Sequence, residues 1–260
     1  MVPEYNVTTL NGYTPQEQEM NLKLNELFEE WFGCLKEKAV GRFDPTWFVT
    51  DGSYPRYTEQ KTKVLFIGRE AHSIAGSSYI DVLYNAYKTN YIGGRHINKY
   101  AFHRRLFYIA YGLTHNCPPW TEIPYPGDIT ADFACPSGLS FAFMNLSKLS
   151  NETNHPTRMN WSVVTPFIEC CQNAGTNFFN REIAILKPDI IITMNFYYCL
   201  TALGELETLE PHPYADRLLL KVDGRSIPLL NTYHFSAIKS DLDVFYNPVV
   251  EVWKGFQTCA

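Results

Sequence analysis

The chain has 260 residues, of which 45% are hydrophobic and 19% are charged, so its composition is that of a globular protein and not of a disordered or fibrous one. Its formal charge is -5, from 22 Lys plus Arg against 27 Asp plus Glu, which excludes the uniformly basic surface of a protein that coats nucleic acid. The sequence has neither the basic and apolar start of a signal peptide nor about 18 uninterrupted apolar residues. We therefore expect a cytoplasmic, monomeric protein without a membrane span, folded as one domain over residues 1–260.

A long amphipathic helix is predicted near the start of the chain. Thr14, Pro15 and Glu17 form a capping box with proline at the first helical position. The residues that follow at helical spacing are apolar: Met20, Leu24, Leu27, Phe28, Trp31, Phe32 and Leu35. Residues 1–60 are expected to form a helical extension packed on the rest of the domain.

Strands and helices alternate along the rest of the chain. Short apolar runs that end at polar turns predict buried strands at Val64–Ile67, Leu139–Met144 and Ile190–Ile192. Helices are predicted at Tyr79–Tyr87, Asn98–Tyr111, Trp161–Gln172, Phe178–Leu186 and Tyr197–Leu203, with a last one that is capped by Asn247 and Pro248 and runs through Trp253. Apolar runs at 218–222 and 227–230 flank an Asp-Gly turn and predict a β-hairpin. This alternation indicates a mainly parallel sheet with helices on both faces and long loops at 118–136 and 150–160.

Polar residues follow the predicted strands at the edge where such sheets bind ligands, outside the carboxyl ends of the strands. After the first strand the chain runs from Gly68 through Glu70 to Ser73, and after the second from Asn145 to Lys148. After the last strand come Tyr233, His234, Phe235 and Ser236. A carboxylate, a carboxamide and an imidazole at one edge are suited to reading a small heterocycle and to handling charge at a neighbouring carbon.

These segments resemble, in order, the motifs of the uracil-DNA glycosylase superfamily. Residues 68–73 stand where the family carries G-Q-D-P-Y-H or G-E-A-P-G, and residues 142–148 look like its strand that ends in Asn and continues to Lys. Residues 181–192 are similar to the helix and strand before its fourth region, and residues 230–236 look like its T-Y-H-P-S. The resemblance covers roughly residues 64–238. It implies a three-layer α/β/α fold with a mainly parallel, four-stranded central sheet.

The resemblance also implies an activity. A DNA glycosylase is a hydrolase that flips uracil or a modified base out of DNA and cleaves its N-glycosidic bond. In this chain Ala71 and His72 replace the Pro-Tyr pair that shields uracil from thymine, and Phe235 replaces the Pro of H-P-S. A base other than uracil is therefore equally consistent with the motifs.

Cleavage of an N-glycosidic bond requires an anion near C1′ and hydrogen-bond donors at the oxygens of the departing base. Glu70 would supply the anion, and His234 would donate to a base oxygen. Asn145 would read the edge of the base with its carboxamide. The plainer alternatives are a glutamate that caps the next helix, a packed histidine and an asparagine in a strand-end turn.

Further residues are candidates for contacts with a bound nucleic acid. The candidates for contact with the base and its sugar are Gly68, Arg69, Ala71, His72, Tyr79, Lys148 and Ser236. The candidates for contact with DNA are Ser73, Ser147, Ile238, Lys239, Arg104 and Arg105. Ile238 is the candidate wedge that enters the duplex. For Tyr79 a place in the core is the plainer alternative, and for the two arginines a solvated helix face.

Two other classes of function compete with the glycosylase interpretation. The first is a non-catalytic protein of the same fold that binds nucleic acid or a nucleotide. The second is a small-molecule hydrolase that uses Ser236 or Cys170 with His234, although the chain has no G-x-S-x-G motif. His72, His96 and His103 lack the spacing of metal ligands, and the cysteines lack an iron-sulfur pattern, so no metal or other cofactor is expected.

Overall fold

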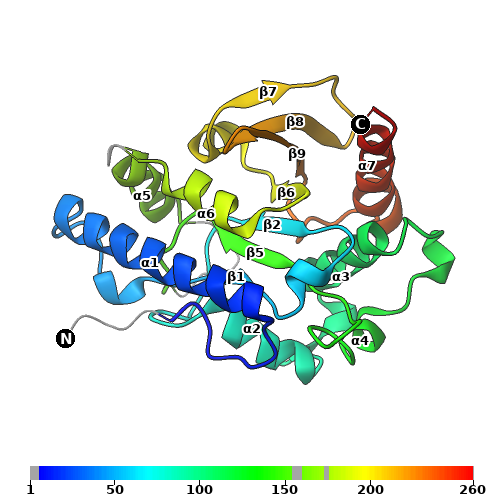
Figure 1. Ribbon diagram of the computed structural model, residues 1–260, viewed down its shortest axis with the longest axis horizontal. Coiled ribbons are helices and arrows are strands. Elements are labelled where there is room, and N and C mark those ends of the chain that lie inside the picture. The colour runs from blue at the N-terminus through cyan, green and yellow to red at the C-terminus, as the bar shows by residue number, and fades with distance from the viewer. Residues whose placement is uncertain (1–5, 154–159, 173–175, 260) are drawn as a thin grey trace.

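The structure, a computed structural model, describes residues 6–153, 160–172 and 176–259. In this part of the chain a seven-stranded sheet has the order β1-β5-β2-β6-β9-β8-β7 (Figure 1). Its strands are β1 (Gly52–Ser53), β2 (Val64–Gly68), β5 (Ala142–Asn145), β6 (Ile190–Met194), β7 (Leu206–Thr208), β8 (Ala215–Val222) and β9 (Arg225–Thr232). A separate two-stranded hairpin is formed by β3 (Tyr91–Ile92) and β4 (Arg95–His96).

The α/β class and the mainly parallel centre of the sheet are confirmed, but the sheet as a whole is mixed and has seven strands, so a four-stranded sheet is not confirmed. Strands β5, β2, β6 and β9 are neighbours and run parallel. Antiparallel strands extend this centre at both edges, with β1 beside β5 on one side and β8 followed by β7 on the other. Because β1 has two residues and β7 three, neither is long enough to show the alternating pattern by which a strand is predicted.

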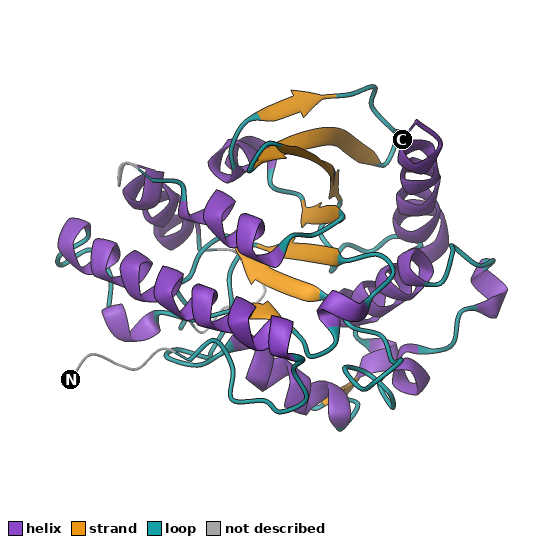
Figure 2. Cartoon of the chain, viewed as in Figure 1, coloured by secondary structure: helices purple, strands orange, loops and turns teal. Residues whose placement is uncertain are grey.

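Helices cover both faces of this sheet (Figure 2). They are α1 (Pro15–Lys38), α2 (Tyr79–Lys88), α3 (Ala101–Thr114), α4 (Pro126–Ile129), α5 (Trp161–Gln172), α6 (Phe178–Leu186) and α7 (Asn247–Cys259). Short 3-10 turns lie at Pro45–Trp47, Tyr57–Glu59, Ile97–Lys99, Trp120–Glu122 and Tyr197–Leu203, and a π-helical turn lies at Asp241–Tyr246. None of the helices in the described part of the chain is long and apolar enough to cross a membrane.

Several predicted boundaries differ from the observed ones for local reasons. Helix α3 begins after the 3-10 turn 97–99, and the predicted helix 197–203 is itself a 3-10 turn. Helix α4 and the turn 120–122 interrupt the predicted loop 118–136. Asn247 continues from the preceding π-helical turn, whose first N–H groups are capped by Ser240. Part of the predicted loop 150–160 lies outside the described residues.

The capping box and the hairpin turn agree with their predictions. Thr14 Oγ1 accepts a hydrogen bond from the backbone N–H of Glu17, and Glu17 Oε2 accepts one from the N–H of Thr14. The buried Glu17 carboxylate also accepts from the N–H groups of Arg56 and Thr58, so it ties the start of α1 to the next loop. Residues 223 and 224 join β8 to β9 with φ values of 48° and 73°, the left-handed geometry expected of an Asp-Gly turn.

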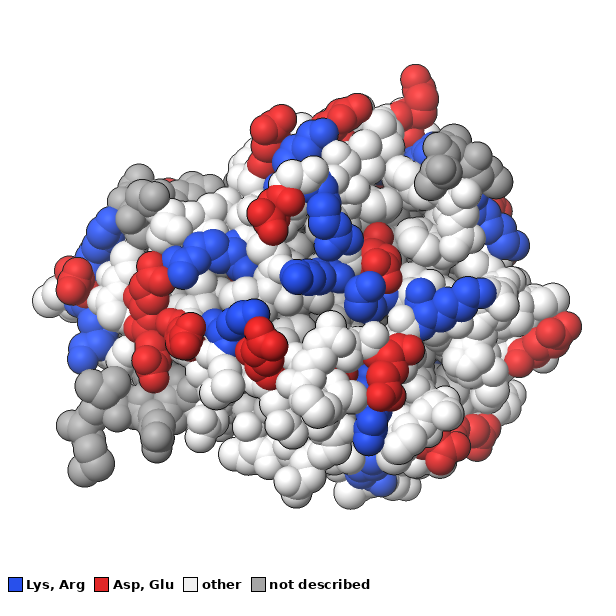
Figure 3. All heavy atoms as spheres, in the orientation of Figure 1, with Lys and Arg blue, Asp and Glu red and all other residues white. Residues whose placement is uncertain are grey.

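The surface carries both signs of charge. Basic and acidic side chains are interspersed on the face drawn in Figure 3, with no broad field of one sign. This agrees with the small net charge of -5 in the sequence. A general electrostatic attraction between this face and a polyanion is therefore weak.

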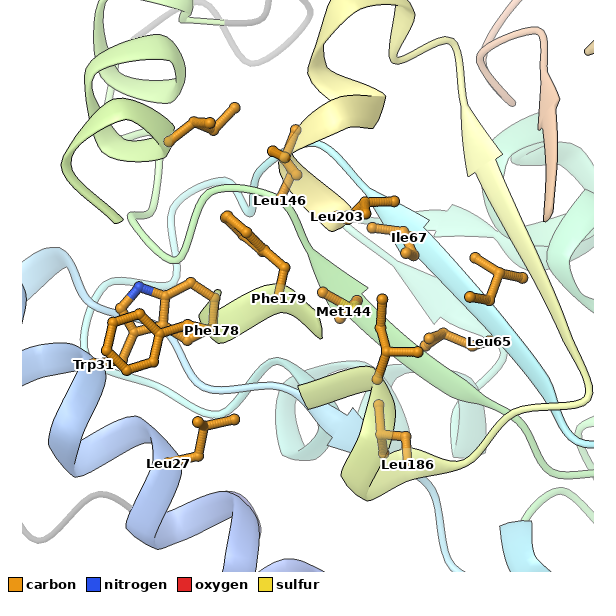
Figure 4. Packing of buried hydrophobic residues seen from close by; sticks show 14 of the residues in the cluster. Leu27, Trp31, Leu65, Ile67, Met144, Leu146, Phe178, Phe179, Leu186 and Leu203 are labelled. Atoms are coloured by element: carbon orange, nitrogen blue, oxygen red, sulfur yellow. The ribbon is translucent and has the colours of Figure 1, made fainter. Parts of the chain in front are cut away.

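The core lies in two layers, one on each face of the sheet. Along β2, Leu65 and Ile67 point to the layer under α1, α5 and α6, whereas Val64 and Phe66 point to the layer under α2, α3 and α7. Figure 4 shows the first layer, in which Trp31 of α1 lies against the aromatic residues of α6. Each fully buried side chain of this size contributes about 1.5–3 kcal/mol. The two layers hold the parallel strands in place and so fix the edge at which their carboxyl ends meet.

Candidate functional site

The loops that follow the parallel strands are joined to one another at the carboxyl edge of the sheet. The backbone N–H of Ser147 donates to the carbonyl of Arg69, and that of Asn151 donates to the carbonyl of Ala71, each over 2.8 Å. The Arg69 guanidinium in turn donates to the carbonyl of Asn195, after β6, also over 2.8 Å. The segments after β2, β5 and β6 therefore form one connected surface.

Glu70 is the most deeply placed acid of this surface. Its side chain is 2% exposed. Glu70 Oε1 accepts hydrogen bonds from Asn151 Nδ2 over 2.9 Å and from the backbone N–H of Asn160 over 3.0 Å, and His72 Nε2 lies 3.7 Å away. Glu70 Oε2 is buried and has no hydrogen-bond partner among the described residues. One oxygen of the carboxylate is thus held by two donors, and the other is buried without a hydrogen-bond partner among the described residues.

Two further buried polar atoms beside Glu70 also lack partners in the described part of the chain. They are Arg69 Nε and His72 Nδ1. Leaving a buried polar group unpaired costs about 1–3 kcal/mol. Three such atoms lie within residues 69–72, and further ones lie in the core, among them Tyr54 Oη and Glu182 Oε1. Burial also lowers the pKa of the Arg69 guanidinium.

His234, after β9, is held in one tautomer. The backbone N–H of Ser236 donates to His234 Nδ1 over 3.2 Å, so the neutral ring carries its proton on Nε2. Burial, together with repulsion from Arg69, His72 and Arg105, lowers the pKa of His234 to about 4. At neutral pH the ring is therefore an uncharged hydrogen-bond donor.

Asn145, at the end of β5, is oriented by Asp51. The buried Asp51 Oδ2 accepts from the backbone N–H of Asn145 over 2.6 Å and from its Nδ2 over 3.5 Å. Asn145 Oδ1 then lies toward Gly68, where a Cβ atom would come within 3.2 Å of it. The same Cβ would lie 2.7 Å from the ring of Phe143, so the end of β2 has no room for a side chain.

Lys148 does not reach this surface. Its side chain is fully buried, with Nζ 2.6 Å from Asp51 Oδ1 and 2.8 Å from Glu182 Oε2, and it lies over the rings of Phe28 and Trp31. Burial and the nearby Asp51 raise the pKa of Glu182 well above its ordinary value. The hypothesis that Lys148 contacts a substrate does not fit this position, because the Lys148 ammonium group is already paired with carboxyl groups inside the protein.

The predicted stacking residue Tyr79 is also engaged. Tyr79 is 7% exposed, and its ring stacks on Phe143 with centroids 4.6 Å apart. Phe102, at the start of α3, is half-buried and its ring centroid lies 5.7 Å from that of His234. Phe102 is therefore the better placed ring, and sequence reasoning missed it because nothing but an aromatic position in a helix marks it.

Arg104 and Arg105 bind the protein itself. Their Nε atoms lie 2.5 and 2.7 Å from the two oxygens of Asp241. Arg105, whose side chain is 3% exposed, also donates to the carbonyls of Phe235, Ala237 and Lys239. A direct role of these arginines in DNA binding does not fit these contacts. Arg105 instead fixes the loop after His234.

The remaining candidates divide into exposed and buried residues. The exposed ones are Ser73, Ser236, Ile238 and Lys239, and Ile238 at 104% exposure is the most exposed large apolar residue described. The buried ones are Ala71 and Ser147, whose Oγ accepts from the N–H of Leu149. A phosphate contact from Ser147 would require this loop to open.

The three histidines considered as metal ligands do not meet. His72 lies beside Glu70, His96 Nδ1 accepts from the N–H of Asn98, and the buried His103 is hydrogen-bonded to the hydroxyl of Tyr87. Within the described ranges, no group of three or more His, Cys, Asp or Glu side chains is arranged to hold a metal ion. Comparison with protein-family models and with curated proteins found no match for this chain.

Proposed function

We propose that the protein is a nucleic-acid glycosylase related in fold to the uracil-DNA glycosylases, which hydrolyses the N-glycosidic bond of a flipped uracil or modified base. The observation that carries the proposal is the buried Glu70 carboxylate, with one oxygen fixed by Asn151 and Asn160 and the other without a partner among the described residues. The ordered motifs from residues 64 to 238 support the same conclusion.

In the proposed reaction Glu70 faces the sugar. As the bond between C1′ and the base nitrogen breaks, positive charge develops on the sugar, and the Oε2 carboxylate oxygen stabilises it. The bonding electron pair leaves with the base, and a water molecule then bonds to C1′ through its oxygen and gives a proton to Oε2. The fixed Oε1 keeps the carboxylate from rotating between these steps.

His234 and Asn145 have the chemistry required at the departing base. Neutral His234 donates from Nε2 to a base oxygen, and this bond strengthens as the base becomes anionic. The lowered pKa of His234 suits this role, because an uncharged ring is present at all pH values near 7. Asn145 Oδ1 accepts from a ring N–H or an exocyclic amino group, and the Phe102 ring lies beside His234 as an apolar wall.

The test is base release from a panel of oligonucleotides, read by mass spectrometry. The panel contains uracil, hypoxanthine, and oxidised and hypermodified bases in single and double strands. We expect release from at least one substrate, and a loss of about 10²–10⁴-fold in Glu70→Gln. His234→Ala should also lower the rate, whereas Glu152→Gln, which changes an exposed carboxylate one residue after Asn151, serves as the matched control.

Absence of release from every member of the panel, by a protein shown to be folded, would overturn the enzymatic proposal. A non-catalytic protein that binds nucleic acid or a nucleotide would then take its place. If Glu70→Gln still releases the base, the protein is a glycosylase but Glu70 is not required for the reaction.

A further inference from the structure

Large exposed side chains gather next to the residues of the candidate site. Trp161 (39% exposed) follows Asn160, which donates to Glu70. Tyr197 (66%) comes two residues after Asn195, which accepts from Arg69. Tyr233 (39%) directly precedes His234. These three aromatic residues, here called the aromatic row, come from three separate segments of the chain.

The sheet order places the aromatic row across the carboxyl edge. Trp161 is connected through Asn160 to the loop after β2, Tyr197 follows β6, and Tyr233 follows β9. Strands β2, β6 and β9 are consecutive neighbours in the sheet, and neighbouring strands lie about 4.8 Å apart. The three residues therefore lie on segments that follow neighbouring strands or are hydrogen-bonded to the loop after one of them.

Tyr197 is held outward at a cost in free energy. Its φ of 44° and the φ of 64° at Asn195 are left-handed, which is uncommon for any residue except glycine and strained for a bulky one. The buried Phe196 between them anchors the turn through its backbone N–H, which donates to Asn231 Oδ1 over 3.0 Å. The turn thus buries Phe196 and exposes Tyr197.

The charges nearby indicate which form of nucleic acid fits. Of the basic residues predicted to contact a nucleic acid, Arg104, Arg105 and Lys148 are paired with carboxylates of the protein, and Arg69 donates to the carbonyl of Asn195. Lys239 remains exposed, with Nζ 4.5 Å above the ring of Tyr233. A duplex offers mainly phosphates to such an edge, whereas a single strand also offers unstacked base faces.

We propose that the aromatic row binds the unpaired nucleotides on either side of the target base, so that the preferred substrate is single-stranded nucleic acid. This inference rests on the proposed function, since that function assigns the adjoining site to a nucleobase. Aromatic stacking supplies most of the affinity, and phosphate contacts supply little.

The experiment measures affinity by fluorescence anisotropy, with the intact protein and a labelled oligonucleotide of ordinary bases, free and annealed to its complement. We expect the single strand to bind at least tenfold more tightly than the duplex. Tyr197→Ala and Tyr233→Ala should each weaken single-strand binding about tenfold, and Tyr197→Phe should retain it. Affinity should fall only slightly as salt is raised.

The matched control is Tyr125→Ala, because Tyr125 is 67% exposed and lies outside the loops that follow β2, β6 and β9. Thermal unfolding of each variant confirms that it is folded. Equal affinity for duplex, an equal loss in Tyr125→Ala, or no binding of either form would each overturn the inference.

Failure of this inference is distinguishable from failure of the proposed function, because no base is released from the binding probe. If base release depends on Glu70 but the Tyr197 and Tyr233 variants bind normally, the inference about the aromatic row is refuted and the glycosylase proposal stands. If the aromatic row binds single strands but no base is released from the panel, the glycosylase proposal is refuted and the binding inference stands.

Discussion

Two regions of this molecule bury charge behind the carboxyl edge of the same sheet, and they treat it differently. In the first, here called the ionic network, the buried Lys148 lies between Asp51 and Glu182, and all three side chains are fully buried. In the second, Glu70 is 2% exposed but is held only by the amide of Asn151 and the N–H of Asn160, with one oxygen unpartnered among the described residues.

The two regions differ in how their carboxylates are paired inside the protein. In the ionic network the positive Lys148 forms an ion pair with Asp51, and the raised pKa of Glu182 favours the protonated form of this carboxyl group. At Glu70 the two hydrogen-bond donors are uncharged, while His72 Nε2 lies 3.7 Å away and Arg69 interacts electrostatically with the carboxylate. Removing one partner of a buried ion pair is strongly destabilising because it leaves the other charge uncompensated, whereas a carboxylate held by uncharged donors has no such partner to lose.

The largest expected effect on stability comes from the ionic network. Lys148→Met leaves Asp51 buried without its cation, and we expect the free energy of unfolding to fall by about 3–5 kcal/mol. Glu70→Gln should change this free energy much less, because the amide keeps the size of the side chain and an oxygen that accepts from Asn151 and Asn160. Urea unfolding followed by tryptophan fluorescence measures both. A larger loss in Glu70→Gln than in Lys148→Met would contradict the distinction.

A smaller effect is expected at Gly68, which lies between the two regions. In Gly68→Ala the new methyl group would lie 2.7 Å from the Phe143 ring, and we expect unfolding to become easier by about 1–3 kcal/mol. Adding Phe143→Leu should recover part of this loss by making room. If the double variant is no more stable than Gly68→Ala, steric crowding is not the cause.

The lowered pKa of His234 predicts how the stability of the protein depends on pH. Its pKa of about 4 in the folded protein is below the ordinary 6.5, so the unfolded chain binds the proton more readily. The stability that His234 contributes is complete above pH 6.5 and is lost as pH falls toward 4. The loss is below about 1.4 kcal/mol per pH unit, because the ring is partly exposed.

The measurement for His234 is the titration of its ring by NMR, assigned with His234→Gln. A midpoint near 4 is expected. A midpoint near 6.5 would show that neither burial nor the neighbouring cations act on the ring. In that case the neutral-donor role proposed for His234 would lose its basis.

The smallest effect is expected for a surface pair. Arg181 and Glu30 lie 2.6 Å apart but are 42% and 52% exposed, so water screens their attraction. Arg181→Gln should lower the free energy of unfolding by only about 0.2–1 kcal/mol, and less at high salt. Chemical denaturation at two salt concentrations checks this. A loss as large as that of Lys148→Met would mean that burial does not decide the strength of an ion pair here.

Much of the fold could be predicted from local pattern. The capping box of Thr14 and Glu17, the strand at Val64 and the Asp223-Gly224 hairpin turn are decided by residues within a few positions of one another. The edge strands β1 and β7 were missed, since two or three residues carry no period. Their pairing depends on neighbours distant in the chain.

The candidate site divides in the same way. Sequence order alone singled out Glu70, Asn145 and His234 as the polar residues that follow strands. In the structure Glu70 lies beside buried atoms without partners among the described residues, and His234 is a neutral hydrogen-bond donor. The roles proposed for Lys148 and Arg105 did not fit, because their partners Asp51 and Asp241 are separated from them by 97 and 136 positions.

The sequence by itself determined the element types, the α/β class and which polar residues end the strands, because these depend on short-range periodicity, capping and turn chemistry. Only the tertiary structure decided which charges are paired inside the protein, which ring lies beside His234 and which aromatic residues stay exposed at the edge. The physical reason is that burial and pairing depend on long-range packing, which brings together side chains that are far apart along the chain.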